Sequence, residues 1–346
     1  MKKLLTVLCA GALVLGCLTA CNSESDTPKD THTDDSTVEV TTPHVTETIE
    51  SETLEGYATV EQMMEDDSMI RMEQAGYPEL EAMDMSQLPE SYADILRGIC
   101  ERIQTYQILY RVDGCTVAAY VSVPKDYTEN TRPLIIFNRG GNGNFGAYSA
   151  AQIGMIAQLT DCVVIASQYR ETKPGTGTDE FGGADVEDVL FWVDRVKDMG
   201  FVDHQNVYMV GESRGGMQTC LALCADKDRV IRAAVCVSGV YDLFATYEQR
   251  TDMRDMLNYR VGGTPTSAPE RYEARSPICF VDEIEVPLLM IHSTGDEKVA
   301  YSQAAAFAEA MQNSGKTYEL ITRNTASHGL ETPYEWTTVM EWLFMQ

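Results

Sequence analysis

Short continuous apolar runs recur along the chain from residue 133 onward. They lie at residues 133–137, 162–166, 207–210, 233–237 and 287–291. Stretches with a helical apolar period separate these runs, for example residues 184–199 and 214–225. Buried strands that alternate with helices are typical of a parallel sheet covered by helices on both faces.

A different pattern precedes these runs. Residues 106–112 and 115–123 alternate apolar and polar positions around Asp113-Gly114, a dipeptide that supplies the positive-φ residues of a tight hairpin. We therefore expect an α/β domain over residues 105–346. In this domain an antiparallel hairpin leads a mostly parallel sheet of about eight strands.

Apolar residues at irregular helical spacing come before the hairpin. They are Met63, Met64, Ile70, Met72 and Leu80. We interpret residues 56–104 as a helical N-terminal extension that covers the main domain. A flexible, methionine-rich binding surface is the alternative.

The first residues indicate targeting. Lys2 and Lys3 precede an apolar stretch over residues 4–18, which is short for a bilayer span. The following Leu-Thr-Ala-Cys21 resembles the lipobox of bacterial lipoproteins, which implies cleavage before Cys21 and a diacylglyceryl group on its sulfur. Residues 1–20 are then a signal peptide, and the exported chain is anchored to the outer face of the bacterial cytoplasmic membrane. An ordinary signal peptide with an incidental cysteine is the alternative.

Residues 21–55 are rich in Ser, Thr, Asp and Glu and have almost no large apolar side chain, so we expect a disordered tether. Their acidity contributes to a formal net charge of −27. This charge would repel nucleic acid and anionic lipid, so we expect no nucleic-acid partner and membrane contact only through the anchor.

Cysteine and histidine spacings bear on disulfides and metals. Of the ten cysteines, Cys9 and Cys17 lie in the signal peptide and Cys21 is the lipidation site. The others fall mostly in apolar runs, which predicts buried thiols with at most a bridge or two. No Cys-x-x-Cys or His-x-x-x-His spacing occurs, so we expect no metal and no cofactor.

A candidate nucleophile follows the apolar run at residues 207–210. The sequence there is Gly-Glu-Ser213-Arg-Gly-Gly, and a helical stretch begins directly after the serine. Glycines beside the serine let the backbone turn sharply and hold the hydroxyl clear of the sheet. The motif is short, but its place between a strand and a helix indicates that Ser213 is a nucleophile.

A serine hydroxyl needs a base to take its proton, and elimination among the five histidines indicates His328. It follows the last predicted strand. The other four are excluded by position: His32 and His44 lie in the tether, His204 precedes the nucleophile strand at the wrong end of the sheet, and His292 is a core residue of a strand.

A carboxylate should orient this histidine. Asp296 follows the strand at residues 287–291 and gives the chain order Ser213, Asp296, His328, which the α/β-hydrolase fold requires. Glu297 is the competing carboxylate.

Three stretches resemble the prolyl oligopeptidase family of serine peptidases. They are residues 211–216, residues 276–299 and residues 326–329, and residues 179–188 are similar to the approach to that family's catalytic helix. The resemblance covers residues 105–346 and implies an α/β-hydrolase fold and peptide-bond hydrolysis through an acyl-enzyme. Two features depart from the family: Ser293 stands where glycine is usual, and the stretch before the hairpin is too short for the family's N-terminal β-propeller.

Acyl transfer also needs hydrogen-bond donors for an oxyanion. The backbone N–H of Arg214, next after the nucleophile, is one candidate. Asn-Arg139-Gly-Gly141 resembles the family's His-Gly-Gly loop with arginine in place of histidine, which implies the N–H of Gly141 as the second. The overlapping Gly-x-Gly-x-x-Gly at residues 141–146 fits a dinucleotide fingerprint, but the next strand leads to Arg170 instead of an acidic residue for the ribose.

Arg139, Arg170 and Arg214 all follow strands near the nucleophile. They either pair with the chain's carboxylates or bind a substrate carboxylate or peptide carbonyl. Tyr241 opens an aromatic, helical stretch over residues 241–262, which we expect to form a lid that supplies walls of the substrate pocket.

These features together predict a serine hydrolase that acts on a peptide or small acyl substrate. A carboxylesterase or deacylase would use the same machinery on the same fold. A non-catalytic binding lipoprotein is the alternative of a different class. Substrate side chains, endo or exo mode, disulfides and oligomeric state stay open.

Overall fold

A nine-stranded sheet forms the centre of the computed structural model, which describes residues 56–346. Its strand order is β1-β2-β3-β5-β4-β6-β7-β8-β9. The strands are β1 (Met69–Ala75), β2 (Ile103–Val112), β3 (Cys115–Pro124), β4 (Arg132–Asn138), β5 (Val163–Ser167), β6 (Val202–Glu212), β7 (Ala233–Val237), β8 (Leu288–Ser293) and β9 (Tyr318–Arg323). The pairs β1/β2, β2/β3 and β3/β5 are antiparallel and the rest are parallel. This confirms the mostly parallel sheet with leading antiparallel strands.

The predicted hairpin turns between β2 and β3. Asp113 and Gly114 have φ angles of 50° and 75°, and Val112 pairs with Cys115. Two successive positive-φ residues give the turn a twist that matches the twist of the strands. The Asp-Gly dipeptide therefore fixes the register of the whole hairpin.

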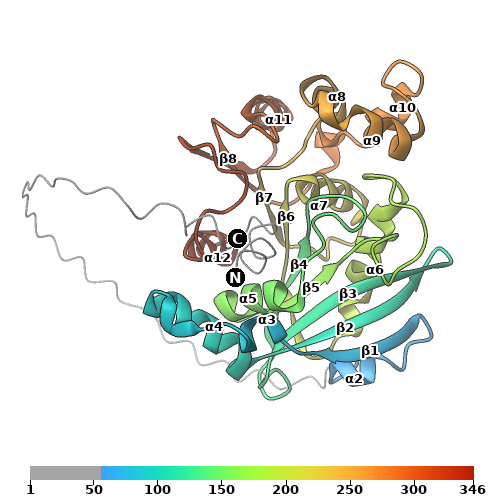
Figure 1. Cartoon of the computed structure of the whole chain (residues 1–346). Helices are drawn as coiled ribbons and strands as arrows, with labels where there is room; N and C mark the ends of the chain where they lie inside the picture. The colour runs from blue at the N-terminus through green and yellow to red at the C-terminus, as the bar shows by residue number, and fades with distance from the viewer. Residues whose placement is uncertain (1–55) are drawn as a thin grey trace, which may run out of the picture.

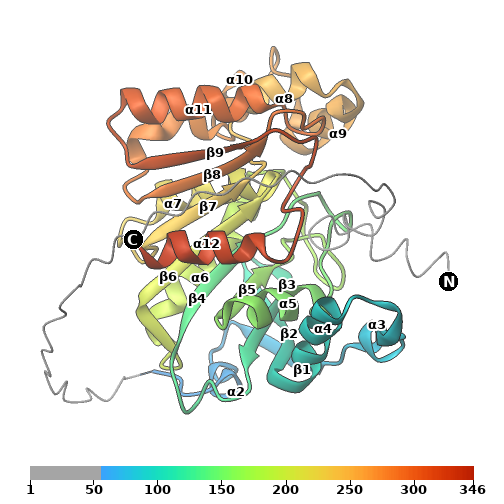
Figure 2. The same ribbon diagram turned by 90° about the vertical axis from the view of Figure 1, so that its left-hand side faces the viewer.

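Helices cover both faces of the sheet (Figures 1 and 2). On one face α5 (Ala150–Thr160) and α12 (Glu335–Phe344) enclose a core that includes Ile153 and Trp336. On the other face α6 (Glu187–Arg195), α7 (Arg214–Ala225) and α11 (Tyr301–Asn313) enclose a second core, which includes Trp192 and Phe307. Apolar residues fill both sides of the central strands, so the continuous apolar runs of the sequence are explained.

Shorter helical segments complete the chain. They are α2 (Val60–Met63), α3 (Pro78–Glu81), η2 (Met85–Gln87), α4 (Glu90–Arg102), η3 (Ala184–Val186), η4 (Val196–Asp198), α8 (Leu243–Gln249), η5 (Thr251–Met253), α9 (Arg254–Leu257), η6 (Asn258–Gly262), α10 (Pro269–Glu273) and η7 (Pro277–Glu283). Figures 1 and 2 show α8, α9 and α10 gathered at one end of the molecule. Residues 241–262 therefore form a helical cover, as expected.

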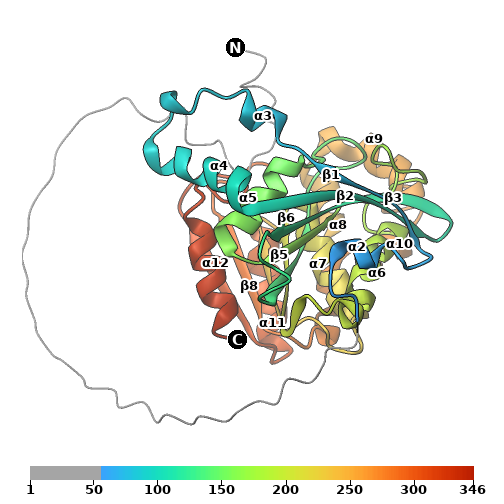
Figure 3. The ribbon, with the colours of Figure 1, turned by 90° about the horizontal axis from the view of Figure 1, so that it is seen from below.

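The predicted helical extension is wrong for residues 69–75. These residues form β1, which pairs with β2 at the edge of the sheet (Figure 3). An edge strand has one neighbour and a partly solvated face, and Ile70 is 42% exposed. The strand therefore lacks the apolar alternation that would distinguish it from a helix in the sequence. Residues 56–102 contain this one strand and hold no propeller blade.

The predicted signal peptide, the predicted lipidation site Cys21 and the predicted tether lie outside the described residues. Within residues 56–346, the structure has no helix with the length and apolar content needed to cross a bilayer.

Candidate active site

Ser213 lies on a strained turn between β6 and α7. Its backbone has φ 58° and ψ −123°, an unusual conformation for a residue other than glycine. A Cβ atom on Gly211 would lie 2.1 Å from the carbonyl oxygen of Gly215, and one on Gly215 would lie 1.9 Å from the carbonyl oxygen of Asn138. Both flanking glycines are therefore required by close backbone approach, as the sequence motif predicts.

His328 and Asp296 come together from two loops. Nδ1 of His328, in the loop between β9 and α12, lies 2.8 Å from Oδ2 of Asp296, in the loop after β8. Oδ1 of Asp296 accepts the backbone N–H groups of Lys298 and Val299 at 2.9 and 3.1 Å. Burial would raise the pKa of Asp296, but the hydrogen bond and charge of His328 and these N–H groups lower it. Asp296 is thus an anion whose orientation is fixed.

The competing residues have other surroundings. Glu297 is exposed, whereas Asp296 is 6% exposed. His292 lies inside β8, and its Nε2 donates to the carbonyl oxygen of Val299 at 2.9 Å. Burial lowers the pKa of His292, which keeps this ring neutral, as expected of a core histidine.

A pocket of about 450 Å³ is lined by both Ser213 and His328. Its walls come from the loop after β4, the turn at Ser213, the helical cover and the loops after β8 and β9. Residues that line it include Phe145, Tyr148, Phe181, Glu212, Ser213, Val240, Arg250, Met253, Met256, Lys298, Val299 and His328. Within residues 56–346 no hydrogen bond joins Ser213 Oγ to His328, and catalytic hydrogen bonds often form only when a substrate is bound.

The loop after β4 lies directly against the serine. A Cβ atom on Gly140 would be 3.1 Å from Cβ and 3.6 Å from Oγ of Ser213. Gly141 has φ +72°, and a Cβ there would lie 2.1 Å from the carbonyl oxygen of Phe145, so glycine is required. The N–H groups of Gly141 and Arg214 donate no hydrogen bond within the described part of the chain, which leaves both free for an oxyanion.

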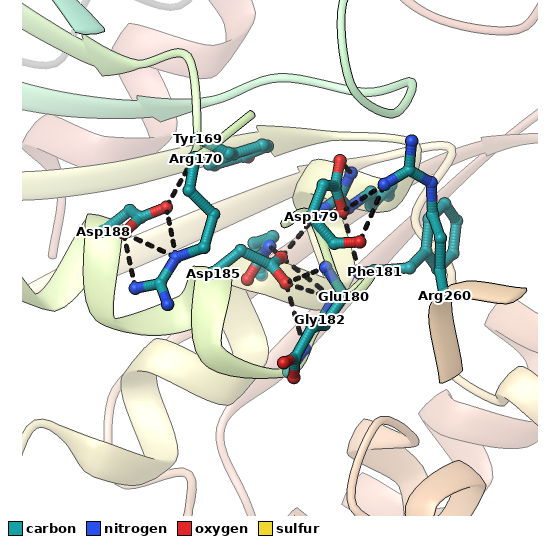
Figure 4. Close-up of polar contacts among 12 residues, drawn as sticks. Tyr169, Arg170, Asp179, Glu180, Phe181, Gly182, Asp185, Asp188 and Arg260 are labelled. Atoms are coloured by element: carbon teal, nitrogen blue, oxygen red, sulfur yellow. Dashed lines mark hydrogen bonds and ion pairs between the residues drawn. The ribbon is translucent and has the colours of Figure 1, made fainter. Parts of the chain in front are cut away.

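Of the two alternatives for Arg139, Arg170 and Arg214, the structure favours contacts within the protein over binding of a substrate, because all three side chains are buried. Arg170 pairs with Asp188 at 2.8 Å (Figure 4). Arg214 is 1% exposed and pairs with Asp179 and Asp185. Arg139 is fully buried and donates to backbone carbonyl groups of its own loop.

Tyr241 also lies outside the pocket. Its ring is fully buried and stacks on Phe307 at a centroid distance of 4.4 Å. The pocket walls come instead from later residues of the same cover, including Arg250, Met253 and Met256. The expectation of a cover that contributes to the pocket agrees with this geometry, but the choice of Tyr241 is wrong.

A buried carboxylate that the sequence does not predict as a site residue lies beside the serine. Glu212 is 6% exposed, lines the pocket and accepts a hydrogen bond from the hydroxyl group of Tyr148 at 3.0 Å. Burial raises the pKa of Glu212. Glu212 occupies a variable position of the Gly-x-Ser-x-Gly motif, so the only signal for it in the sequence is a carboxylate next to the nucleophile.

Within residues 56–346, no three His, Cys, Asp or Glu side chains are grouped so as to hold a metal ion. The seven cysteines of this part of the chain are free thiols.

Sequence comparisons relate the chain to known peptidases. The sequence profile of the prolyl oligopeptidase family matches residues 173–344. The uncharacterized peptidase YtmA of Bacillus subtilis is 28% identical over 228 residues, which cover 66% of this chain and 87% of that protein. Dipeptidyl-peptidase 5 of Porphyromonas gingivalis is 26% identical over 234 residues, which cover 64% of this chain but 34% of the relative.

Solved structures show the same fold. The acylaminoacyl peptidase of Pyrococcus horikoshii superposes with a TM-score of 0.60 at 18% identity, over 70% of this chain and 42% of that one. A puromycin-hydrolyzing peptidase of Mycobacterium tuberculosis superposes with a TM-score of 0.56 at 24% identity, over 71% of this chain and 39% of that one. The chain thus spans less than half the length of these larger peptidases. With its α/β-hydrolase fold and the profile match over residues 173–344, the chain belongs to the prolyl oligopeptidase family of serine-type hydrolases.

Proposed function

We propose that this chain is a serine peptidase that cleaves its substrate through an acyl-enzyme on Ser213. The observation that carries the proposal is the 2.8 Å contact between Nδ1 of His328 and Asp296, beside a pocket that His328 and Ser213 both line. Membership of the prolyl oligopeptidase family and the peptidases among its relatives support a peptide substrate.

In the first step, Ser213 Oγ attacks the carbonyl carbon of the substrate, and its proton passes to Nε2 of His328. Because Nδ1–H of His328 donates to Asp296, the ring presents an unprotonated Nε2 as the base. The anionic carboxylate then stabilises the imidazolium that forms. Removing such a carboxylate lowers kcat by about 10⁴-fold in well-studied triads.

The tetrahedral intermediate places negative charge on the former carbonyl oxygen. The N–H groups of Gly141 and Arg214 would donate to this oxygen, and one such donor contributes about 3–4 kcal/mol to lowering the barrier. His328 then gives its proton to the leaving amine, and the acyl group stays on Ser213. A water molecule, deprotonated by His328, finally attacks the acyl carbon and releases the serine.

Parallel turnover assays test the bond type. We expect the wild-type protein to hydrolyse aminoacyl-p-nitroanilides, and we expect Ser213→Ala to hydrolyse neither these nor p-nitrophenyl esters. Hydrolysis of esters alone would overturn the peptidase assignment in favour of a carboxylesterase or deacylase. Hydrolysis of neither class would favour a binding protein that keeps the fold.

We further infer that the protein is exported and held at the outer face of the cytoplasmic membrane through Cys21, with residues 21–55 as a tether. The resemblance of residues 18–21 to a lipobox supports this. Two acyl chains give stable membrane attachment, at about 0.8 kcal/mol for each buried methylene group. In Triton X-114 phase separation of expressing bacteria, the wild type should enter the detergent phase and Cys21→Ser the aqueous phase. Equal partition of the two would contradict lipidation.

A further inference from the structure

The carboxylate of Asp179 lies between the turn at Ser213 and the loop after β4. Asp179 is fully buried in the connection between β5 and α6. Its two carboxylate oxygens accept hydrogen bonds from Nη1 and Nη2 of Arg214 at 2.7 and 2.8 Å. The oxygen that bonds Nη1 also accepts a hydrogen bond from the backbone N–H of Gly143 at 2.7 Å. One side chain therefore contacts both the loop with the candidate donor and the residue next to the nucleophile.

Arg214 links Asp179 to Gly141 by hydrogen bonds. Its Nη1 donates to the carbonyl oxygen of Gly141 at 2.9 Å. Because Asp179 receives both ends of the guanidinium fork, the plane of the fork is fixed, and with it the direction of the bond to Gly141. The peptide group that follows Gly141 is thus held in place.

Arg139 holds the peptide group that precedes Gly141. Its Nη1 donates to the carbonyl oxygen of Gly140 at 2.8 Å, and its Nη2 donates to the carbonyl oxygen of Gly143 at 2.7 Å. The carbonyl of Gly140 and the N–H of Gly141 belong to one planar trans peptide group, so they point in opposite directions. Fixing this carbonyl therefore also fixes the direction of the candidate oxyanion donor.

The loop needs such support because its backbone is unusual. Gly141 and Gly143 have φ angles of +72° and +49°. Glycine is also the residue that loses most conformational freedom when it is ordered. Donor geometry matters to a few tenths of an ångström for an oxyanion, so a mobile loop would stabilise the intermediate less.

Resting on the function proposed above, we propose that Asp179 and Arg139 are positioning residues. Together with Arg214, they fix four successive peptide groups, from the one that joins residues 140 and 141 to the one that joins residues 143 and 144, so that the N–H of Gly141 is directed at the oxyanion. Neither residue touches the substrate.

The charges of these groups support the assignment. Burial would raise the pKa of Asp179, but the charge and hydrogen bonds of Arg214 and the N–H groups of Gly143 and Phe181 lower it. Burial, together with the charge of Arg214, lowers the pKa of Arg139 to about 10, which leaves it cationic at neutral pH. The hydrogen bonds that Asp179 and Arg139 make to the loop are therefore charge-assisted at neutral pH.

Asp188 offers a matched control. It is also fully buried and also pairs with a buried arginine, Arg170 (Figure 4), but within residues 56–346 no hydrogen bond joins it to the loop over residues 140–143. Asp179→Asn and Asp188→Asn each remove one buried charge with little change of shape. A purely structural role for Asp179 would therefore affect the two variants alike.

The experiment compares the wild type, Asp179→Asn and Asp188→Asn, first by thermal unfolding and then by hydrolysis of p-nitrophenyl butyrate. Affinity for an alkyl trifluoromethyl ketone is measured as well, since addition of Ser213 Oγ to this ketone creates an oxyanion. We expect kcat of Asp179→Asn to fall by about 10-fold or more with KM changed less than about twofold. For Asp179→Asn, the inhibition constant of the ketone should rise by the same factor as kcat/KM falls. For Asp188→Asn, kcat, KM and the inhibition constant should each stay within about twofold of the wild type.

Equal kinetics of the two variants, or a fall in kcat without loss of affinity for the ketone, would overturn the inference alone. An inert wild-type protein would overturn the proposed function and the inference with it. Should Asp179→Asn fail to fold, Arg139→Lys is measured in the same way, because lysine keeps the charge but not the fork. Wild-type kcat in this variant would also overturn the inference.

Discussion

Nδ1 of His328 donates a hydrogen bond to Oδ2 of Asp296 at 2.8 Å, although the two residues are 32 positions apart in the chain. The contact exists because β8 and β9 are parallel neighbours whose carboxyl ends open into adjacent loops. It lies at the same end of the sheet as the turn that carries Ser213, which follows β6. The topology of the sheet therefore brings together three side chains that the sequence separates widely.

Asp296→Asn tests the role of this contact. The amide cannot stabilise an imidazolium, and it favours the wrong tautomer of His328, so we expect kcat to fall by about 10³–10⁴-fold with little change in KM. Glu297→Gln is the control, since Glu297 is exposed and adjacent. Similar losses in the two variants would contradict the assignment of Asp296.

Gly141→Ala tests the loop beside the serine. Alanine would be strained at φ +72°, and its Cβ would meet the carbonyl oxygen of Phe145 at 2.1 Å, so the donor must move. We expect kcat to fall by about 10²-fold or more, as on removal of an oxyanion donor. Gly114→Ala is a matched control because it has φ +75° but open space around its Cβ. It should lose about 1 kcal/mol of stability and keep its activity. Retention of kcat by Gly141→Ala would argue against this donor.

Glu212→Gln should change the pH dependence of stability. Burial raises the pKa of Glu212 in the folded state. The wild type therefore has its full stability from this group below the ordinary glutamate pKa and loses it as pH rises through the raised value. Glutamine keeps an acceptor for Tyr148 and has no charge to bury. The variant should unfold at a higher temperature than the wild type at pH 8, and this gain should shrink towards pH 4.5.

Differential scanning fluorimetry across this pH range measures the difference, with Glu297→Gln as the exposed control. A gain in Tm that is independent of pH, or one that grows as pH falls, is the result that this reasoning excludes.

Arg170→Met separates structure from substrate recognition. Its partner Asp188 is fully buried, so the loss of Arg170 leaves a buried carboxylate without its cation. We expect a loss of about 3–5 kcal/mol in the free energy of unfolding, measured with urea. The ratio of activities on carboxylated and neutral substrates should not change. Arg71→Met, which breaks an exposed pair with Glu73, should leave stability nearly unaltered. A selective loss on carboxylated substrates would show that Arg170 binds substrate after all.

Much of this architecture could be predicted from local sequence. The strand runs and the Asp113-Gly114 turn carry strong local signals, and the order Ser213, Asp296, His328 follows from which loops end at the same edge of a parallel sheet. The strands and the turn are predicted by the spacing of apolar residues and by turn residues within a few positions, and the chain order then follows from the sheet topology.

The partners of the arginines could not be predicted in the same way. Arg139, Arg170 and Arg214 all follow strands near the nucleophile, and position alone does not distinguish a substrate ligand from a buried ion pair. The distinction depends on long-range ion pairs with Asp179, Asp185 and Asp188 for Arg170 and Arg214, and on hydrogen bonds to backbone carbonyl groups for Arg139. The edge strand β1 is not predictable from local sequence for a related reason, because its pairing with β2 is a long-range contact.

Covalent labelling of Ser213 tests the central claim most directly. The wild-type protein and Ser213→Ala are treated with a fluorophosphonate, and intact mass and peptide mapping identify the adduct. A single adduct on the wild type, located at Ser213 and absent from the folded variant, is the predicted result. A folded wild type that stays unlabelled, or equal labelling of Ser213→Ala, would contradict the assignment of Ser213 as the nucleophile.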